Sequence, residues 1–137
     1  MDLEQSLQIS FAGMAAQGTR LRVVSENLAN ADSAASPEGG PYQRRIPVFE
    51  ATSLPGADGE DAIGVKVAAV LRDQTPPRVT HDPSNPLADA SGNIAQPSIN
   101  PVLEMVDMMQ ASRSYEANLS TLQTAHNVAL KTLDILK

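Results

Sequence analysis

All ten prolines of the chain lie between Pro37 and Pro101, which leaves 36 residues before them and 36 after them free of proline. Proline lacks a backbone N–H donor, and its ring clashes with the preceding turn of a helix. Long helices are therefore possible only at the two ends of the chain. Terminal helices around a proline-rich insert are more typical of a protein that packs with itself or with neighbours than of an enzyme.

The composition limits the core that such helices can build. Aromatic residues make up only 3% of the 137 residues, and there is no tryptophan. Aromatic side chains contribute much of the burial energy of compact cores, so this core must consist of Leu, Val, Ile, Met and Ala. The length allows one domain with extensions. We expect a helical seam that is completed by other chains rather than an independent globule.

Charge and cysteine content exclude several classes of function. The formal net charge of −6 argues against nucleic-acid binding, because phosphate contacts need a basic surface. No cysteine is present, so disulfides and thiolate chemistry are excluded. The acidic and polar residues 1–8 do not resemble a secretory signal, and no run of 18 apolar residues could cross a membrane. We expect a soluble protein made in the cytoplasm, without direct membrane insertion.

The first segment, residues 1–33, has apolar residues at helical spacing. They recur every seven residues as Leu7, Met14, Leu21 and Leu28. Gly13 and Gly18 lower the helix propensity but allow a neighbouring helix to approach closely. The spacing predicts a helix from about Leu3 to about Asn30.

The last segment, residues 100–137, has stronger helix signals. Asn100 suits the N-cap, Pro101 suits the first helical position, and Glu104 favours the positive end of the helix dipole. One heptad position contains Met105, Ser112, Leu119, His126 and Leu133, and the other contains Met108, Tyr115, Leu122, Ala129 and Leu136. The pattern predicts a helix that continues to the last turn. The apolar stripes of both terminal helices are wider than a two-stranded seam, which indicates more than one helix partner for each.

The insert, residues 34–99, is predicted to contain short strands and turns. The stretch 42–50 looks extended, with Pro47 confining it to a sheet edge. Residues 63–71 alternate like a half-buried strand, and Arg78–His81 is a third candidate. The turn-rich stretches are 54–61, 82–86 and 91–93. Two or three strands bury little surface, so this β module must lean on a helix or on a neighbour.

These segments together predict a mainly α fold with a small β insert. The N-terminal helix of segment 1–33 and the C-terminal helix of segment 100–137 are expected to pack as a coiled-coil-like pair. The two segments would then form one discontinuous domain. Segment 34–99 would supply a β-hairpin or short strands between them.

No stretch has a pattern typical of catalysis or metal binding. His81 and Asp82 lie near loop serines, but the chain has only two histidines and no Gly-x-Ser-x-Gly elbow. The oxygen-rich stretch 82–93 does not match the spacing of an EF-hand loop. Neither cysteine nor a His-Glu-x-x-His motif offers a zinc site. We therefore predict no enzyme activity, no catalytic residue, no cofactor and no bound metal.

The end of the first helix carries a more specific motif. Its residues are Ser25, Asn27, Leu28, Ala29 and Asn30. The two asparagines are three residues apart and therefore share a helix face. Asn30 is a good helix terminator, whereas Asn27 lies one turn earlier and needs partners for two donors and an acceptor oxygen. We hypothesise that both asparagines form hydrogen bonds between the helices, or from the insert to a helix, that set their register.

Residues 27–32, Asn-Leu-Ala-Asn-Ala-Asp, resemble the signature of the bacterial flagellar rod, hook and hook–filament axial proteins. Three further stretches resemble the proximal-rod members of this family: 42–50, 82–93 and 100–137. Within the last of these, the run Asn-Pro-Val-Leu-Glu-Met-Val-Asp-Met-Met-Gln-Ala-Ser-Arg-Ser-Tyr-Glu-Ala-Asn is highly specific. The resemblance covers nearly the whole chain.

The resemblance implies a structural subunit of the flagellar basal body, in the rod that carries torque across the periplasm. It implies export by the flagellar type III apparatus without a cleaved signal, and terminal helices that form the inner layer of a helical tube. The implied partners are the rod proteins FlgB, FlgF and FlgG, the adapter FliE, and other copies of the chain. A sister proximal-rod protein is the alternative within the family, and a coiled-coil adaptor is the alternative outside it.

Assembly is expected to use the apolar seams of the two helices. The residues that we assign to these seams are Leu7, Met14, Leu21, Leu28, Met105, Met108, Tyr115, Leu119, Leu122, Leu133 and Leu136. In an open helical assembly every subunit presents two different faces, so polymerisation completes the burial that a single chain does not achieve.

Overall fold

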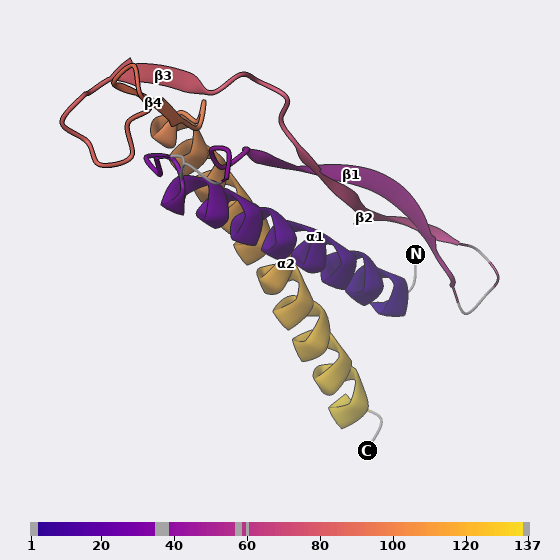
Figure 1. Cartoon of the computed structure of the whole chain (residues 1–137). Helices are drawn as coiled ribbons and strands as arrows, with labels where there is room; N and C mark the ends of the chain where they lie inside the picture. Colours follow the sequence, from indigo (N-terminus) through magenta and orange to yellow (C-terminus); the bar gives the residue numbers. More distant parts are fainter. Residues whose placement is uncertain (1–2, 35–38, 57–58, 60, 136–137) are drawn as a thin grey trace.

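The computed structural model describes residues 3–34, 39–56, 59 and 61–135. Two long terminal helices pack together, with one antiparallel hairpin alongside and a shorter antiparallel sheet near one end of the pair (Figure 1). The elements in chain order are α1 (Leu3–Ala29), β1 (Arg45–Leu54), β2 (Ala62–Arg72), β3 (Arg78–His81), β4 (Asn93–Gln96) and α2 (Pro101–Ile135). The predicted class, mainly α with a small β insert, is confirmed.

The helix boundaries follow from local capping chemistry. The amide of Asn30 donates to the Glu26 carbonyl at 2.8 Å, one residue after α1 ends. At the start of α2, the side-chain oxygen of Asn100 accepts the Val102 N–H at 3.0 Å, and Pro101 occupies the first helical position. Both helices therefore begin and end within a residue or two of the predicted positions.

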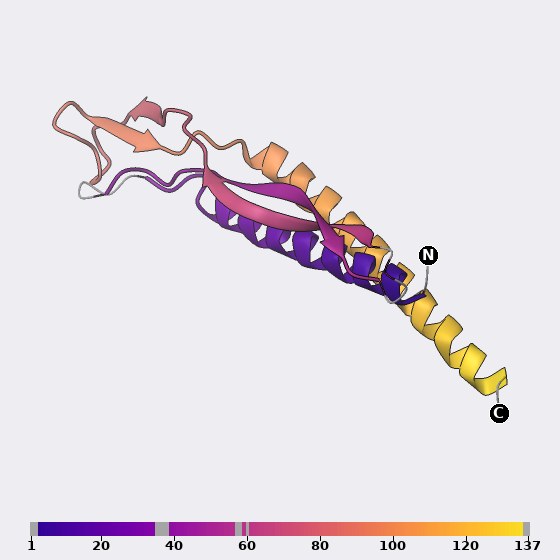
Figure 2. The same ribbon diagram turned by 90° about the vertical axis from the view of Figure 1, so that its right-hand side faces the viewer.

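The two helices pack antiparallel through small residues. A Cβ atom on Gly13 would lie 2.7 Å from the side-chain nitrogen of Asn118, so the backbone of α1 approaches α2 closely there. At the other end of the helix pair, the hydrogen bond between Asn27 and Glu104 gives the same antiparallel register as the approach of Gly13 to Asn118. If this register continues to Leu3, the first described residue of α1, then Leu3 lies opposite about residue 128 of α2. The last turns of α2 therefore project beyond α1, as Figure 2 shows.

The longer sheet is a hairpin of β1 and β2 that lies along α1. Its register runs from Arg45 opposite Arg72 to Leu54 opposite Ala62, with an irregularity after Val48. Both strands contact α1, and a Cβ on Gly64 of β2 would lie 3.4 Å from the Ala12 side chain. The hairpin thus leans on a helix of its own chain, as its small size requires. Part of the predicted turn 54–61 lies outside the described residues.

The shorter sheet pairs β3 with β4, and the sequence pattern missed β4. Asn93 was predicted to end a turn, but it starts a strand and pairs with His81. Gly92 makes this possible, because its φ of 76° is a conformation that side chains rarely adopt. Between the strands, the carboxylates of Asp82 and Asp89 accept backbone N–H groups of Ser84 and Ser91 as local turn caps.

The core of the chain is thin. Its buried apolar residues are mostly small: Ala16, Val23, Val24, Ala31, Ile94, Ala111 and Ala125. The accessible surface is 8978 Å², whereas a compact monomer of this mass exposes about 6,900 Å². The excess of about 2,000 Å² exceeds what one partner contributes to a standard interface, about 800 Å². The shape therefore leaves surface for more than one neighbour.

Candidate assembly site

The predicted seam residues flank the helix contact instead of forming its centre. On α1 the four heptad residues are half-buried, and the fully buried positions are mostly smaller residues: Ser10, Gly13, Ala16, Val23, Val24 and Asn27. Small residues occupy the centre because they allow the two helix backbones to approach, which displaces the larger side chains to the flanks. The assembly role of these flanking residues stays a prediction.

On α2 the packing face is displaced by one residue from the first predicted heptad position. Met105 and His126 are exposed, whereas the preceding residues, Glu104 and Ala125, are buried. The second heptad position agrees better with the contact, since Met108, Tyr115 and Leu122 are half-buried. Leu119 is also half-buried; the side chain of Leu133 and all of Leu136 lie outside the described residues. The prediction missed this register because Glu104 and Asn118 are polar.

Asn27 is the best-satisfied polar residue of the motif, and it is 1% exposed. Its amide nitrogen donates to the Arg45 carbonyl at 2.8 Å and to a Glu104 carboxylate oxygen at 3.0 Å. Its amide oxygen accepts the Tyr42 hydroxyl at 3.0 Å and the Arg45 N–H at 2.8 Å. All the donors and lone pairs of one side chain are thus used to join α1, α2 and the start of β1.

Glu104 is the charged counterpart of Asn27 and is also 1% exposed. One carboxylate oxygen accepts a hydrogen bond from the Asn27 amide, and the other accepts one from Nε of Arg44 at 2.6 Å. A buried carboxylate without such partners would be strongly destabilising. The ion pair therefore ties the first turn of α2 to the residue that precedes β1. Neither Glu104 nor Arg44 was singled out as a site residue; the only signal was their place in the two family-like stretches.

Further polar contacts surround these two buried residues. Arg45 pairs with Glu26 of α1 at 2.8 Å, and its guanidinium lies 5.9 Å from the centre of the Tyr42 ring. Burial raises the pKa of Tyr42; Arg45 opposes this shift, and Glu26 and Glu104 reinforce it. We call Asn27, Tyr42, Arg44, Arg45 and Glu104 the polar junction.

Asn30 does not form the contact between elements that we hypothesised. Its side-chain amide donates to the Glu26 carbonyl of its own helix at 2.8 Å, and its backbone carbonyl accepts a hydrogen bond from the Ser33 hydroxyl at 2.8 Å. Asn30 thus acts as a local terminator of α1. The other motif residues lie at the surface or on the flank: Ser25 and Ala29 are exposed, and Leu28 is half-buried.

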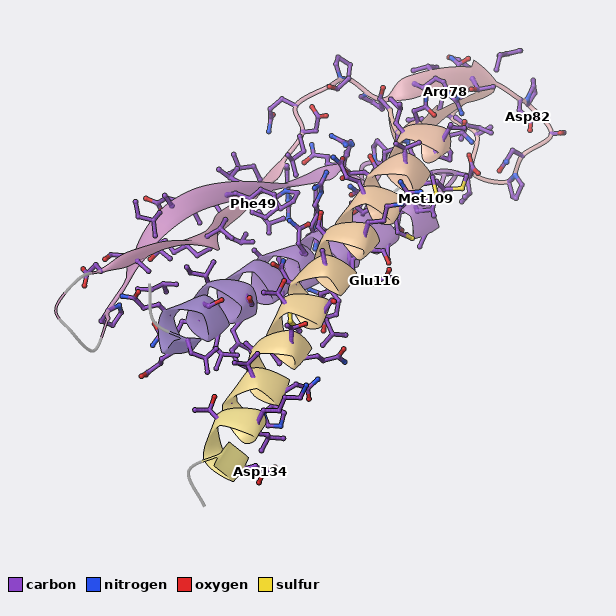
Figure 3. The ribbon with its side chains drawn as sticks, turned by 180° about the vertical axis from the view of Figure 1, so that it is seen from behind. Phe49, Arg78, Asp82, Met109, Glu116 and Asp134 are labelled. Carbon is purple, nitrogen blue, oxygen red and sulfur yellow. The ribbon has the colours of Figure 1, made fainter. Side chains whose placement is uncertain are left out.

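An apolar stripe lies on the side of α2 that faces away from α1. It consists of Val102, Met105, Val106 and Met109, which are 46–64% exposed. Their spacing places them on one helix face, opposite Glu104 and Ala111, which are buried. We call these four residues the α2 stripe; Met109 marks it in Figure 3.

The wide apolar stripe of α1 is covered in part by its own chain, because α1 packs against α2 and against the hairpin of β1 and β2. More than one helix partner for each terminal helix, in an assembly, stays a prediction. Among the described helices and strands, α2 packs only against α1, and the α2 stripe remains exposed. Between β1 and the helices lies a cleft of about 360 Å³, lined in part by Ile46, Phe49 and Asp107.

Within the described residues, no helix has the length and apolar character needed to cross a membrane. In the same part of the chain, no group of three or more histidine or carboxylate side chains is placed to hold a metal ion.

The last third of the chain matches a known protein family. Residues 90–135, which contain β4 and α2, match the family model described as the C-terminal region of the flagellar basal body rod FlgEFG proteins. This match covers the C-terminal third of the chain and indicates the class, the flagellar rod proteins.

Whole-chain relatives are more specific. The chain is 45% identical to the flagellar basal-body rod protein FlgC of Salmonella typhimurium and 44% identical to that of Escherichia coli O6:H1, in each case over 98% of both chains. It is 38% identical to FlgC of Agrobacterium fabrum, over 98% of this chain and 96% of that protein. The chain therefore belongs to the FlgC family of flagellar basal-body rod proteins, and it is a structural rod subunit of the basal body.

Proposed function

We propose that this subunit assembles through its terminal helices into a helical tube that transmits torque across the periplasm. The observation that carries the proposal is the helix pair itself, which leaves the α2 stripe and about 2,000 Å² of excess surface uncovered relative to a compact monomer. Neighbouring subunits that cover this surface complete the burial. Torque is then resisted by many modest contacts in parallel.

The partners proposed for this assembly are the rod proteins FlgB, FlgF and FlgG, the adapter FliE, and further copies of the chain. Family membership supports assembly with other rod components, and the resemblance of the motifs supports these particular ones. Export by the flagellar type III apparatus, without a cleaved signal, belongs to the same proposal. Segments 1–33 and 100–137 act as the assembly domain, and segment 34–99 gives the subunit its local shape.

The polar junction has a separate role in this proposal: it orients the hairpin relative to the helix pair. Asn27 and Glu104 are buried and join three elements, so they allow only one arrangement of those elements. A subunit whose hairpin is wrongly placed would present the wrong surface to its neighbours.

Replacement of Asn27 by Ala in the native gene tests this role. The change leaves buried partners without hydrogen bonds, and we expect a stability loss of about 3 kcal/mol and fewer assembled rods. Asn30→Ala is the matched control, because it removes only a local contact and should cost no more than about 1 kcal/mol. The measurements are thermal unfolding of the purified chain, the amount of chain in isolated basal bodies, and swimming. Normal rods and motility with Asn27→Ala would contradict the role of Asn27.

A further inference from the structure

The smaller sheet of β3 and β4 is not held against the rest of the subunit. Among the described helices and strands, neither strand packs against α1, α2 or the hairpin of β1 and β2. Figure 2 shows this sheet beyond the end of the helix pair at which α1 ends and α2 begins. We call residues 78–96, which comprise β3, β4 and the turns between them, the small module, and we call the helix pair with the hairpin the body.

The small module is bonded only to itself. At its base, Nη2 of Arg78 donates to the side-chain oxygen of Gln96 at 3.1 Å. Further along, the Asp82 N–H donates to the Gly92 carbonyl at 2.9 Å. Within the part of the chain that the structure describes, no hydrogen bond or ion pair joins the small module to the body. Ile94 is the only buried residue of the module, so apolar packing supplies at most one anchor.

Two linkers, residues 74–77 and 97–99, connect the small module to the body. They leave β3 and β4 at positions that are paired across the sheet, so the linkers start side by side. On the body side, the Asp73 N–H donates to the Arg44 carbonyl at 2.7 Å, and Asn100 caps α2. The body therefore holds the chain up to Asp73 and again from Asn100 onward.

Both linkers border clefts. One cleft of about 140 Å³ is lined in part by residues 40–44, which lead into β1, and by Thr75 and Pro77. Another of about 180 Å³ is lined by Arg78 and residues 97–100. Close packing resists displacement, because contacts are lost before new ones form. Where clefts take the place of such packing, a small rotation costs little free energy.

We propose that the small module turns as one unit on its two linkers, whereas the polar junction keeps the hairpin fixed to the helix pair. Two linkers side by side allow rotation across them but oppose a twist along them. Pro76, Pro77 and Pro97 restrict φ, so each linker bends at few positions and acts as a hinge rather than as a flexible coil. Hinge motions of this kind take microseconds to milliseconds.

The hinge gives a structural subunit one adjustable part. A module that turns can meet neighbouring proteins at more than one angle, while the helix pair stays unchanged. The inference goes beyond the proposed assembly and does not depend on it, because the motion belongs to the isolated chain.

Distances between two spin labels test the motion, because the chain has no cysteine and takes labels only at introduced ones. The pair Val79→Cys/Thr121→Cys joins β3 to α2, and Leu71→Cys/Thr121→Cys is the matched control, since Leu71 lies on the fixed hairpin. All three positions are exposed. The distance distribution of the first pair should be about twice as wide as that of the control. Equal widths would overturn the proposal.

Amide hydrogen exchange separates a hinged unit from a disordered segment. The N–H groups of Asp82 and Asp89 donate within the small module, to the carbonyls of Gly92 and Asn93. If the module turns as one unit, these two amides should exchange more slowly than that of Gln74 in the first linker. Exchange as fast as that of Gln74 would show that the module is not a unit, and the proposal would be wrong.

Linker stiffness provides the third test. Pro76→Gly/Pro77→Gly should widen the distance distribution between labels at positions 79 and 121 further, because glycine releases φ. Pro55→Gly, next to the end of β1, is the matched control and should leave that distribution unchanged. No widening with the double variant would mean that packing on the body positions the module, and the hinge would be disproved.

These results are distinguishable from those that test the proposed function. A rigid small module would end the hinge inference and leave the assembly proposal as it stands. Absence of the unaltered chain from isolated basal bodies would end the assembly proposal alone.

Discussion

At the scale of single residues, the chain combines a thin apolar core with a fully bonded polar junction. Asn27 and Glu104 are as deeply buried as Val23 and Val24. Burial of an amide and a carboxylate is tolerable only because each of their polar atoms has a partner. Such partners are directional, whereas apolar packing is not, so the junction specifies how the insert meets the helices.

Tyr42 makes the junction sensitive to alkaline pH. Its pKa is raised in the folded chain, so the contribution of Tyr42 to stability is complete below the ordinary pKa of about 10 and is lost as pH rises through the folded-state value. The ionised side chain would also lose the hydrogen bond that it donates to Asn27. We expect the stability of the native chain to fall above about pH 10 more than that of Tyr42→Phe.

Denaturant unfolding at several pH values measures this difference. Tyr115→Phe is the matched control, because Tyr115 lies on α2 outside the polar junction. If Tyr42→Phe and the native chain lose stability equally at high pH, the phenol of Tyr42 does not have this role.

At the scale of elements, the helix pair depends on small residues where the backbones come close. Gly13 and Gly18 both lie within α1, and both lower its intrinsic helix propensity. Only Gly13 faces a neighbour: a Cβ there meets the Asn118 side chain, whereas a Cβ on Gly18 meets nothing within 4 Å. Two identical residues in one helix therefore have different reasons to be present.

Alanine substitution at the two glycines should separate these effects. Gly18→Ala is expected to stabilise the chain by up to about 1 kcal/mol, because it raises helix propensity without a new contact. Gly13→Ala should stabilise the chain less than Gly18→Ala, or destabilise it. The added methyl carbon would lie 2.7 Å from the Asn118 amide nitrogen, so that amide would have to move. Thermal unfolding of both variants measures the difference. A larger gain from Gly13→Ala would show that the helices do not approach closely at this point.

At the scale of the whole molecule, the chain is elongated and exposes more surface than a compact protein of its mass. The hairpin covers one side of α1, and the α2 stripe and the projecting end of α2 remain uncovered. Burial in the isolated chain is thus unequal along its length. It is greatest near the polar junction, whereas β3 and most of the described side chains from residue 128 onward are exposed.

The isolated chain should therefore be monomeric at low concentration, with weakly protected ends. Amide hydrogen exchange should be fastest in the projecting end of α2 and slowest near Asn27, where the packing is densest. Sedimentation over a range of concentrations should show open-ended growth, whereas a coiled-coil adaptor would stop at a dimer of fixed size. Strong protection of both ends in a dilute monomer would contradict this expectation.

Local chemistry accounts for most of the secondary structure that could be predicted. Asn100 and Pro101 start α2 by capping, Asn30 ends α1, and the alternation in residues 63–71 marks β2, so each of these elements follows from its own neighbourhood. β4 was missed because a four-residue strand after Gly92 has no period long enough to distinguish it from a turn.

By itself the sequence determined the two terminal helices, the class of the fold and the family, because capping, helical period and motif are all local properties. The tertiary structure alone decided which faces those helices use. It placed small residues at the centre of the seam, gave the second side of α1 to the hairpin, and brought Glu104 to Asn27 across 77 positions of the chain. These outcomes depend on which backbones approach one another, and periodicity within one helix carries no information about that distance.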